Sequence, residues 1–80
     1  MRATVLVRPK PGILDPQGEA VQTSLRKLDF PVADARVGRL VELELDVDDP
    51  ALAREQVERM CSELLANALI ETVEIHLEDR

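Results

Sequence analysis

The 80-residue chain has little of what small domains use to stabilise themselves covalently or through metals. It has one cysteine, Cys61, which excludes an intramolecular disulfide, and Cys61 and His76 are its only soft metal ligands. A domain of this length buries only about 60–65% of the surface that its unfolded chain exposes. Domains this small usually need a disulfide, a metal or a partner chain. We therefore expect a single domain, residues 1–80, that is stabilised by association.

Aromatic residues are almost absent as well, and the chain has neither a net positive charge nor a long apolar run. Phe30 is the only aromatic residue, so no platform for stacked bases can form, and a net charge of −6 opposes binding to phosphates. No apolar run approaches the roughly 20 residues that cross a bilayer, and no secretory signal is expected from the N-terminal sequence. Together with the free thiol, these absences predict a cytoplasmic protein without nucleic-acid or membrane partners.

Apolar and polar residues alternate with a period of two in four stretches, as expected of strands with one buried face. The four predicted strands are residues 3–8, 32–37, 40–47 and 72–78. The alternation is clearest in the third stretch, whose acidic side chains are Glu42, Glu44 and Asp46. The turn Gly38-Arg39 lies between the two middle stretches, and a connection this short predicts an antiparallel hairpin.

Two aspartate-proline pairs, Asp15-Pro16 and Asp49-Pro50, predict helix starts. Aspartate caps a helix N-terminus, and proline fits the first helical turn. Apolar residues then recur at helical spacing. They are Val21, Leu25 and Leu28 after the first pair, and Ala53, Val57, Met60, Cys61 and Leu64 after the second. Asn67 is expected to end the second helix in a left-handed conformation, which asparagine tolerates.

The resulting order, β-α-β-β-α-β, predicts an α+β domain of the ferredoxin-like class, with both helices on one face of an antiparallel sheet. The other sheet face would be charged, with Leu6 and Leu40 among the charges. Its predicted charged residues are Arg8, Asp34, Arg36, Glu42, Glu44, Asp46, Glu74 and His76. Such a face is either solvated or matched to a partner, and the exposed sheet edges are sites for strand addition.

Candidate catalytic groups are few. Cys61 and His76 could form a nucleophile and base pair, but Cys61 lies within an apolar helical stripe, where a free cysteine is typically a core residue. The carboxylates Glu42, Glu44 and Asp46 could act as acid–base groups or hold a hard metal ion. Strand alternation alone also accounts for them, and we favour that interpretation. The composition thus favours a binding or assembly role over catalysis.

The first helix start has one feature that capping does not explain. Gly18 lies in the first helical turn, where glycine costs up to about 1 kcal/mol relative to alanine. A small residue there permits close approach of another chain or an anion. The loop before it is not a phosphate loop, because the Walker spacing and its Lys-Ser/Thr pair are absent.

Three stretches together resemble the PurS family, the accessory subunits of phosphoribosylformylglycinamidine synthase. They are GILDPQGEAV (residues 12–21), ARVGRLVELELD (residues 35–46) and MCSELLANALIE (residues 60–71). The resemblance spans nearly the whole chain, and three motifs in this order are more specific than any one of them. The chain departs from the family pattern at Ile13, at Ala68 and at Thr72-Val73, which affects strand entry.

The resemblance implies a non-catalytic subunit in the fourth step of de novo purine synthesis. That step converts formylglycinamide ribonucleotide to the formylglycinamidine, and the complex uses ATP, magnesium and glutamine, so ATP binding and nucleotide binding are implied for the complex. No cofactor is expected on this chain. A PurS subunit would join the synthetase and glutaminase subunits, help ammonia pass between them, and form a homodimer whose further pairing into a dimer of dimers stays open.

Partner contacts are predicted at the first helix start, at the following turn and on the charged sheet face. The candidate residues are Asp15, Gln17, Gly18, Arg36, Gly38, Arg39 and Glu42. Two alternatives share the fold pattern: a small-molecule-sensing regulatory module and an acylphosphatase-type hydrolase. The second is disfavoured because Pro9 and Pro11 remove backbone donors from the loop that would cradle a phosphate.

Overall fold

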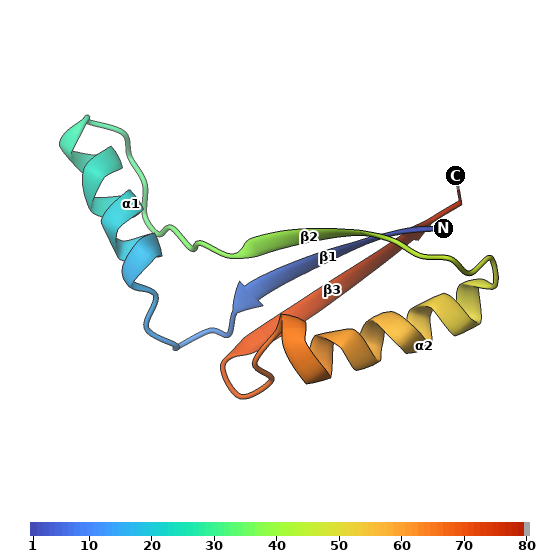
Figure 1. Cartoon of the computed structure of the whole chain (residues 1–80). Coiled ribbons are helices and arrows are strands. Elements are labelled where there is room, and N and C mark those ends of the chain that lie inside the picture. Colours follow the sequence, from blue (N-terminus) through green and yellow to red (C-terminus); the bar gives the residue numbers. More distant parts are fainter. Residues whose placement is uncertain (80) are drawn as a thin grey trace.

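The computed structural model describes residues 1–79. The chain runs through β1 (Arg2–Pro9), α1 (Pro16–Lys27), β2 (Arg39–Glu44), α2 (Pro50–Met60), a π-helical turn η1 (Cys61–Leu65) and β3 (Glu71–Glu78). The three strands form one antiparallel sheet in the order β2-β1-β3. Helix α2 lies along one face of the sheet, whereas α1 projects beyond the strand ends (Figure 1). The molecule is therefore elongated, with extents of 48 × 27 × 14 Å.

The α+β class with an antiparallel sheet is confirmed and is consistent with the ferredoxin-like class. The strand predicted at residues 32–37 is wrong, because that stretch, which lies within the described residues, forms no strand. Side chains occupy the backbone groups that a strand ladder would use. The Arg26 guanidinium donates to the carbonyls of Val32 and Ala33 at 2.8 and 2.9 Å. The Val37 N–H donates to the Asp15 carboxylate at 2.8 Å.

Three further predictions differ from the structure. Without a strand at residues 32–37, Gly38-Arg39 does not form a hairpin turn, and β2 pairs with β1 instead. The strand predicted over residues 40–47 is also shorter, ending at Glu44. The prediction that both helices cover one sheet face holds for α2 but not for α1 (Figure 1).

The core lies between the sheet and α2. Ala3, Val5 and Val7 of β1 are almost completely buried and pack with Val57 and Cys61. Their cross-strand neighbours point to the same face and are partly buried against this core; these are Val41 and Leu43 of β2 and Ile75 and Leu77 of β3. The alternation read from the sequence thus identifies the buried face of all three strands correctly.

The opposite sheet face is charged, as predicted, but three of the predicted residues are not on it. Asp34 and Arg36 are absent because residues 32–37 form no strand, and Asp46 is absent because β2 ends at Glu44. Ion pairs join neighbouring strands across this face. Arg2 lies 3.3 Å from Glu44, and Arg8 lies 3.1 Å from Glu74. At these exposed positions solvent screens the charges, so each pair contributes little to stability. Within residues 1–79, no helix has the length and apolar character needed to cross a membrane.

Helix α1 begins and ends with local signals. Asp15 caps its N-terminus by accepting the Gly18 N–H at 3.0 Å, and Pro16 occupies the first turn. At its other end Asp29 adopts a left-handed conformation with φ of 69°. The N–H groups of Asp29 and Phe30 then donate to the carbonyls of Arg26 and Leu25, which is the Schellman arrangement. These bonds end the helix just before Pro31.

The start of α1 is tethered to the chain that precedes β2. One Asp15 oxygen accepts the Gly18 N–H, and the other accepts the Val37 N–H. Gly18 is buried, and a Cβ there would lie 2.5 Å from the Ala35 carbonyl oxygen. Gly18 therefore permits the close approach expected from the sequence, but the approaching backbone belongs to the same chain. This tether fixes α1 beyond the strand ends.

We predict that Gly18→Ala lowers the free energy of unfolding by about 1–3 kcal/mol, the usual cost of overpacking. The direction is opposite to helix propensity, which favours alanine by about 1 kcal/mol. Urea unfolding measures the difference, with Glu19→Ala at the neighbouring exposed position as the control. Unchanged or increased stability of Gly18→Ala would show that the close approach to Ala35 does not hold α1 in place.

The tether also predicts a pH dependence. The Val37 and Gly18 N–H groups, helped by the Arg36 guanidinium, hold the pKa of Asp15 below its ordinary value. Asp15 therefore stabilises the fold above the ordinary carboxylate range, about pH 4, and this stabilisation is lost as the pH falls through the lowered pKa. Asp15→Asn should be less stable than the native chain at neutral pH and should unfold with a shallower pH dependence. Urea midpoints measured across the acid range test this, and equal slopes for the two proteins would contradict it.

Candidate partner interface

Six of the seven predicted interface residues lie together where β1 ends and α1 begins. Asp15, Gln17, Gly38 and Arg39 line one hollow there, and Arg36 and Gly18 lie beside it. Glu42 is separate, because it lies opposite Thr4 on the charged sheet face. The residues of the α1 start and those of residues 36–39 thus lie on one surface, whereas Glu42 lies on the neighbouring sheet face.

The Arg39 guanidinium makes its hydrogen bonds to groups of its own chain. Its guanidinium binds both carboxylate oxygens of Glu71, at 2.7 and 2.9 Å, and donates to the Leu65 carbonyl at 2.7 Å. The bidentate pair raises the pKa of Arg39 and lowers that of Glu71. Arg39 therefore fastens the start of β2 to the end of η1 and the start of β3, which is a positioning role within the fold.

The loop that follows η1 is organised around the same carboxylate. The Asn67 N–H donates to Glu71 at 2.8 Å, while the Asn67 side chain accepts the Leu69 N–H at 3.0 Å. The left-handed conformation predicted for Asn67 is wrong, since Gly12 and Asp29 are the residues with positive φ among residues 1–79. The role of Glu71 could not be identified from the sequence, because its partner Arg39 lies 32 positions earlier and no local pattern links them.

Arg36 fastens the loop that leads into α1. Its Nη2 donates to the Lys10 carbonyl at 2.9 Å, and its Nε lies 3.8 Å from the Asp15 carboxylate. Gly38 makes a close contact in the same region, because a Cβ at this position would overlap the Val7 carbonyl oxygen. Both residues thus shape the junction between β1, α1 and β2.

The surface of this region is cationic although its charges are paired. The Asp15 and Glu71 side chains are only 12% and 15% exposed, whereas those of Arg36 and Arg39 are 36% and 50% exposed. The carboxylates therefore lie beneath the guanidinium groups. At the other end of the sheet, a hollow is lined by Glu44, Asp46, Asp48 and Asp79. The acidic excess of the chain is thus concentrated away from the predicted interface.

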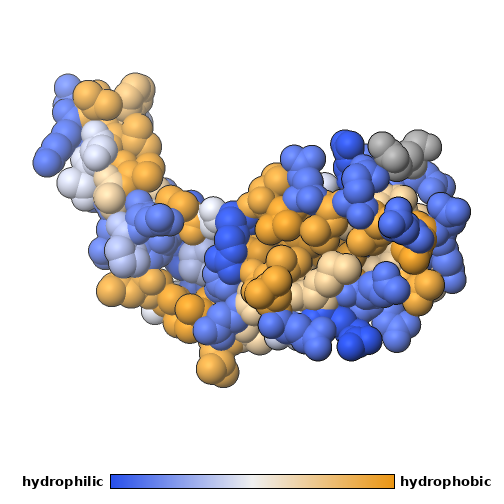
Figure 2. All heavy atoms as spheres, viewed as in Figure 1, coloured by the Kyte–Doolittle hydropathy of each residue, from blue (hydrophilic) through white to orange (hydrophobic). Residues whose placement is uncertain are grey.

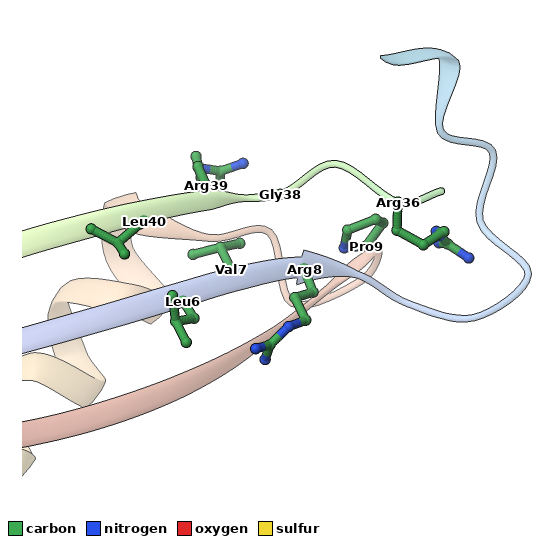
Figure 3. A pocket seen from close by; sticks show the side chains of 8 residues that line it. All are labelled: Leu6, Val7, Arg8, Pro9, Arg36, Gly38, Arg39 and Leu40. Carbon is green, nitrogen blue, oxygen red and sulfur yellow. The ribbon is translucent and has the colours of Figure 1, made fainter. Parts of the chain in front are cut away.

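A shallow hollow of about 340 Å³ opens beside the cationic region. Figure 3 shows it between β1, the start of β2 and the chain before β2, with Leu6, Leu40, Arg8 and Arg36 around it. Leu6 and Leu40 are directly opposite each other in the β1–β2 register. The hollow therefore combines an apolar pair with two guanidinium groups.

Cys61 and His76, the nucleophile and base pair that the sequence disfavours, are not brought together. Cys61 is buried on the α2 side of the sheet, where burial raises the pKa of its thiol, while His76 is exposed on the charged face and contacts Glu74. That contact and Arg8 lower the pKa of Glu74. Among residues 1–79, no three His, Cys, Asp or Glu side chains are grouped as a metal site would require. The geometry offers surfaces for contact, and Cys61 has the surroundings of a core residue.

Comparison with known proteins identifies the family of the chain. The family model "PurS: Phosphoribosylformylglycinamidine (FGAM) synthase" matches residues 2–79. The PurS subunit of phosphoribosylformylglycinamidine synthase from Synechocystis is 43% identical over 68 residues, which cover 84% of this chain and 68% of that protein.

Solved structures show the same fold. The crystal structure of Methanocaldococcus jannaschii PurS is 32% identical and superposes with a TM-score of 0.87, covering 99% of this chain and 96% of that one. A chain of the PurLQS structure from Thermotoga maritima is 30% identical with a TM-score of 0.85, covering 94% of this chain and 93% of that one. The chain therefore belongs to the PurS family, whose curated members are subunits of phosphoribosylformylglycinamidine synthase.

Proposed function

We propose that this chain is the non-catalytic subunit that joins the synthetase and glutaminase subunits of phosphoribosylformylglycinamidine synthase in de novo purine biosynthesis. It would help ammonia pass between them as formylglycinamide ribonucleotide is converted to the formylglycinamidine. The observation that carries this proposal is family membership over residues 2–79, together with the similar chain in the PurLQS structure from Thermotoga maritima. The sensing-module alternative gains no support from these comparisons.

In this proposal the chemistry belongs to the larger subunits. ATP, magnesium and glutamine would act there, and nucleotide binding would be a property of the complex, with no cofactor bound by this chain. The buried thiol of Cys61 and the paired arginines agree with a structural role. The complex would work in the cytoplasm, where a free cysteine stays reduced.

We further infer that the chain works as a homodimer, because α1 carries an uncovered apolar stripe. Val21 is 43% exposed and Leu28 is 67% exposed, and Phe30 just after the helix is 55% exposed. Figure 2 shows apolar atoms along the side of α1 that faces the sheet across open space. Apolar surface of this kind is normally buried against another element.

The core face of the sheet has apolar surface near β2 that α2 does not fully cover. Helix α2 packs nearest β3, and Val41 and Leu43 at the other edge of the same face are only partly buried. The tether at Asp15 and Gly18 keeps α1 of the same chain away from this position. A second copy can supply its own α1 there, so each copy would complete the sheet covering of the other. Pairing of such dimers into tetramers is compatible with the charged faces that stay exposed.

Reconstitution tests the proposed function. The purified chain is mixed with the synthetase and glutaminase subunits from the same genome, and amidine formation is measured with glutamine and, separately, with added ammonia. We expect turnover with glutamine to require this chain, turnover with ammonia to depend on it much less, and the chain alone to be inactive. Equal glutamine-dependent turnover without the chain would overturn the proposal.

The dimer is tested by placing a charge within the α1 stripe. Leu28→Asp should convert the dimer to a monomer, because an aspartate there would have to be buried without a partner. Sedimentation equilibrium measures the mass of the particle. The control is Thr23→Asp, which adds the same charge at an exposed α1 position on the opposite helix face. A dimer that survives Leu28→Asp would show that α1 does not form the contact.

A further inference from the structure

The hollow beside Leu6 and Leu40 has an apolar floor on an otherwise charged face. These leucines form a directly opposed cross-strand pair, and Leu40 is 55% exposed. The neighbouring outward positions on the same face carry Arg2, Arg8, Glu42, Glu44, Glu74 and His76. Leu6 is partly buried, and the exposed surface of Leu40 beside it would be stabilised by contact with an apolar side chain from another polypeptide.

Two guanidinium groups border the same hollow. Arg8 is held in place by a bond to Glu74, and Arg36 by its bond to the Lys10 carbonyl and its pair with Asp15. A guanidinium has five donors, and the contacts described for Arg8 use one of them. Both side chains keep an exposed surface of at least a third. The rim can therefore bind a carboxylate without losing the bonds that position it.

The hollow is open because β1 extends two residues, Arg8 and Pro9, beyond the point where its pairing with β2 stops. The β1–β2 register stops at Val7 opposite Arg39, whereas β1 continues through Arg8 and Pro9 against β3. Figure 3 shows the chain before β2 leaving the sheet at Gly38, which exposes the end of β1 to one side. Small-molecule sites usually enclose most of their ligand. An open step in a sheet is better matched to a polypeptide segment lying across it.

We propose that this hollow docks a segment of a larger subunit of the complex, in which an apolar side chain stands beside an aspartate or glutamate. The proposal rests on the proposed function and names the contact that would serve it. Charge complementarity selects the occupant, since Arg8, Lys10, Arg36 and Arg39 are gathered at this end while acidic residues line the hollow at the other end.

A second copy of this chain is already used on the opposite face of the sheet by the dimer proposed above, so the hollow stays on the outside of that dimer and open to a larger subunit. A further copy could reach the hollow through a two-fold contact in which the acidic end of each copy lies over the hollow of the other. Self-association is therefore measured beside partner binding.

The test measures the affinity of the intact chain for the synthetase and for the glutaminase. Two variants alter the hollow, Leu40→Ser and Arg8→Gln. Two matched controls make the same changes at exposed positions on α2, Leu52→Ser and Arg54→Gln. We expect each hollow variant to weaken binding to one subunit about tenfold, a typical loss for a central contact. Arg8→Gln should also reduce the salt dependence of binding, and both controls should stay within about twofold of the native chain.

Native affinity in both hollow variants would overturn the proposal. Variants that lose self-association but keep partner binding would also overturn it, because a second copy would then occupy the hollow. Urea midpoints identify a variant that fails to fold, and Arg8→Gln leaves the leucine pair intact, so one variant still decides the outcome. If the native chain binds neither subunit, the proposed function itself fails, which is distinguishable from a defect confined to the hollow variants.

Discussion

The position of α1 determines how much of the sheet stays uncovered in a single copy of the chain (Figure 1). The Asp15 carboxylate joins the start of this helix to the Val37 N–H, and the absence of a side chain at Gly18 lets the Ala35 backbone approach. Together they hold α1 beyond the ends of the strands, so it cannot cover its own sheet. A three-stranded sheet with one covering helix buries few side chains completely, here mainly Ala3, Val5, Val7, Ala53 and Val57. A fold of this size needs more buried apolar surface, and a second copy is the nearest source of it.

The cationic end of the molecule follows from the same junction. Arg36 and Arg39 were candidates for partner contact, and both are used first to fasten the chain, Arg36 to the loop before α1 and Arg39 to the start of β3. Because their carboxylate partners lie beneath them, the guanidinium groups still form the outer surface. The residues that position the fold are thus also the residues that a partner would meet, which is efficient in a chain with so few residues.

Sequence patterns predicted the features that depend on neighbouring residues. The Asp-Pro pairs begin both helices, and the period-two alternation identifies the buried face of β1, β2 and β3. The patterns failed where distant side chains intervene. Residues 32–37 alternate as a strand would, yet Arg26 and Asp15 occupy their backbone groups. Gly18 was recognised as unusual, but its neighbour Ala35 could not be identified from spacing, and neither could the pair of Arg39 with Glu71.

The central claim is that association completes this fold, and it can be tested on the chain alone. Urea unfolding would be followed at protein concentrations that differ by about a hundredfold, since a folded dimer in equilibrium with unfolded monomers gains stability by mass action. We predict a midpoint that rises with protein concentration. A midpoint that stays constant over this range, with a folded particle of monomeric mass, would contradict the account, because one copy would then be sufficient to stabilise the sheet.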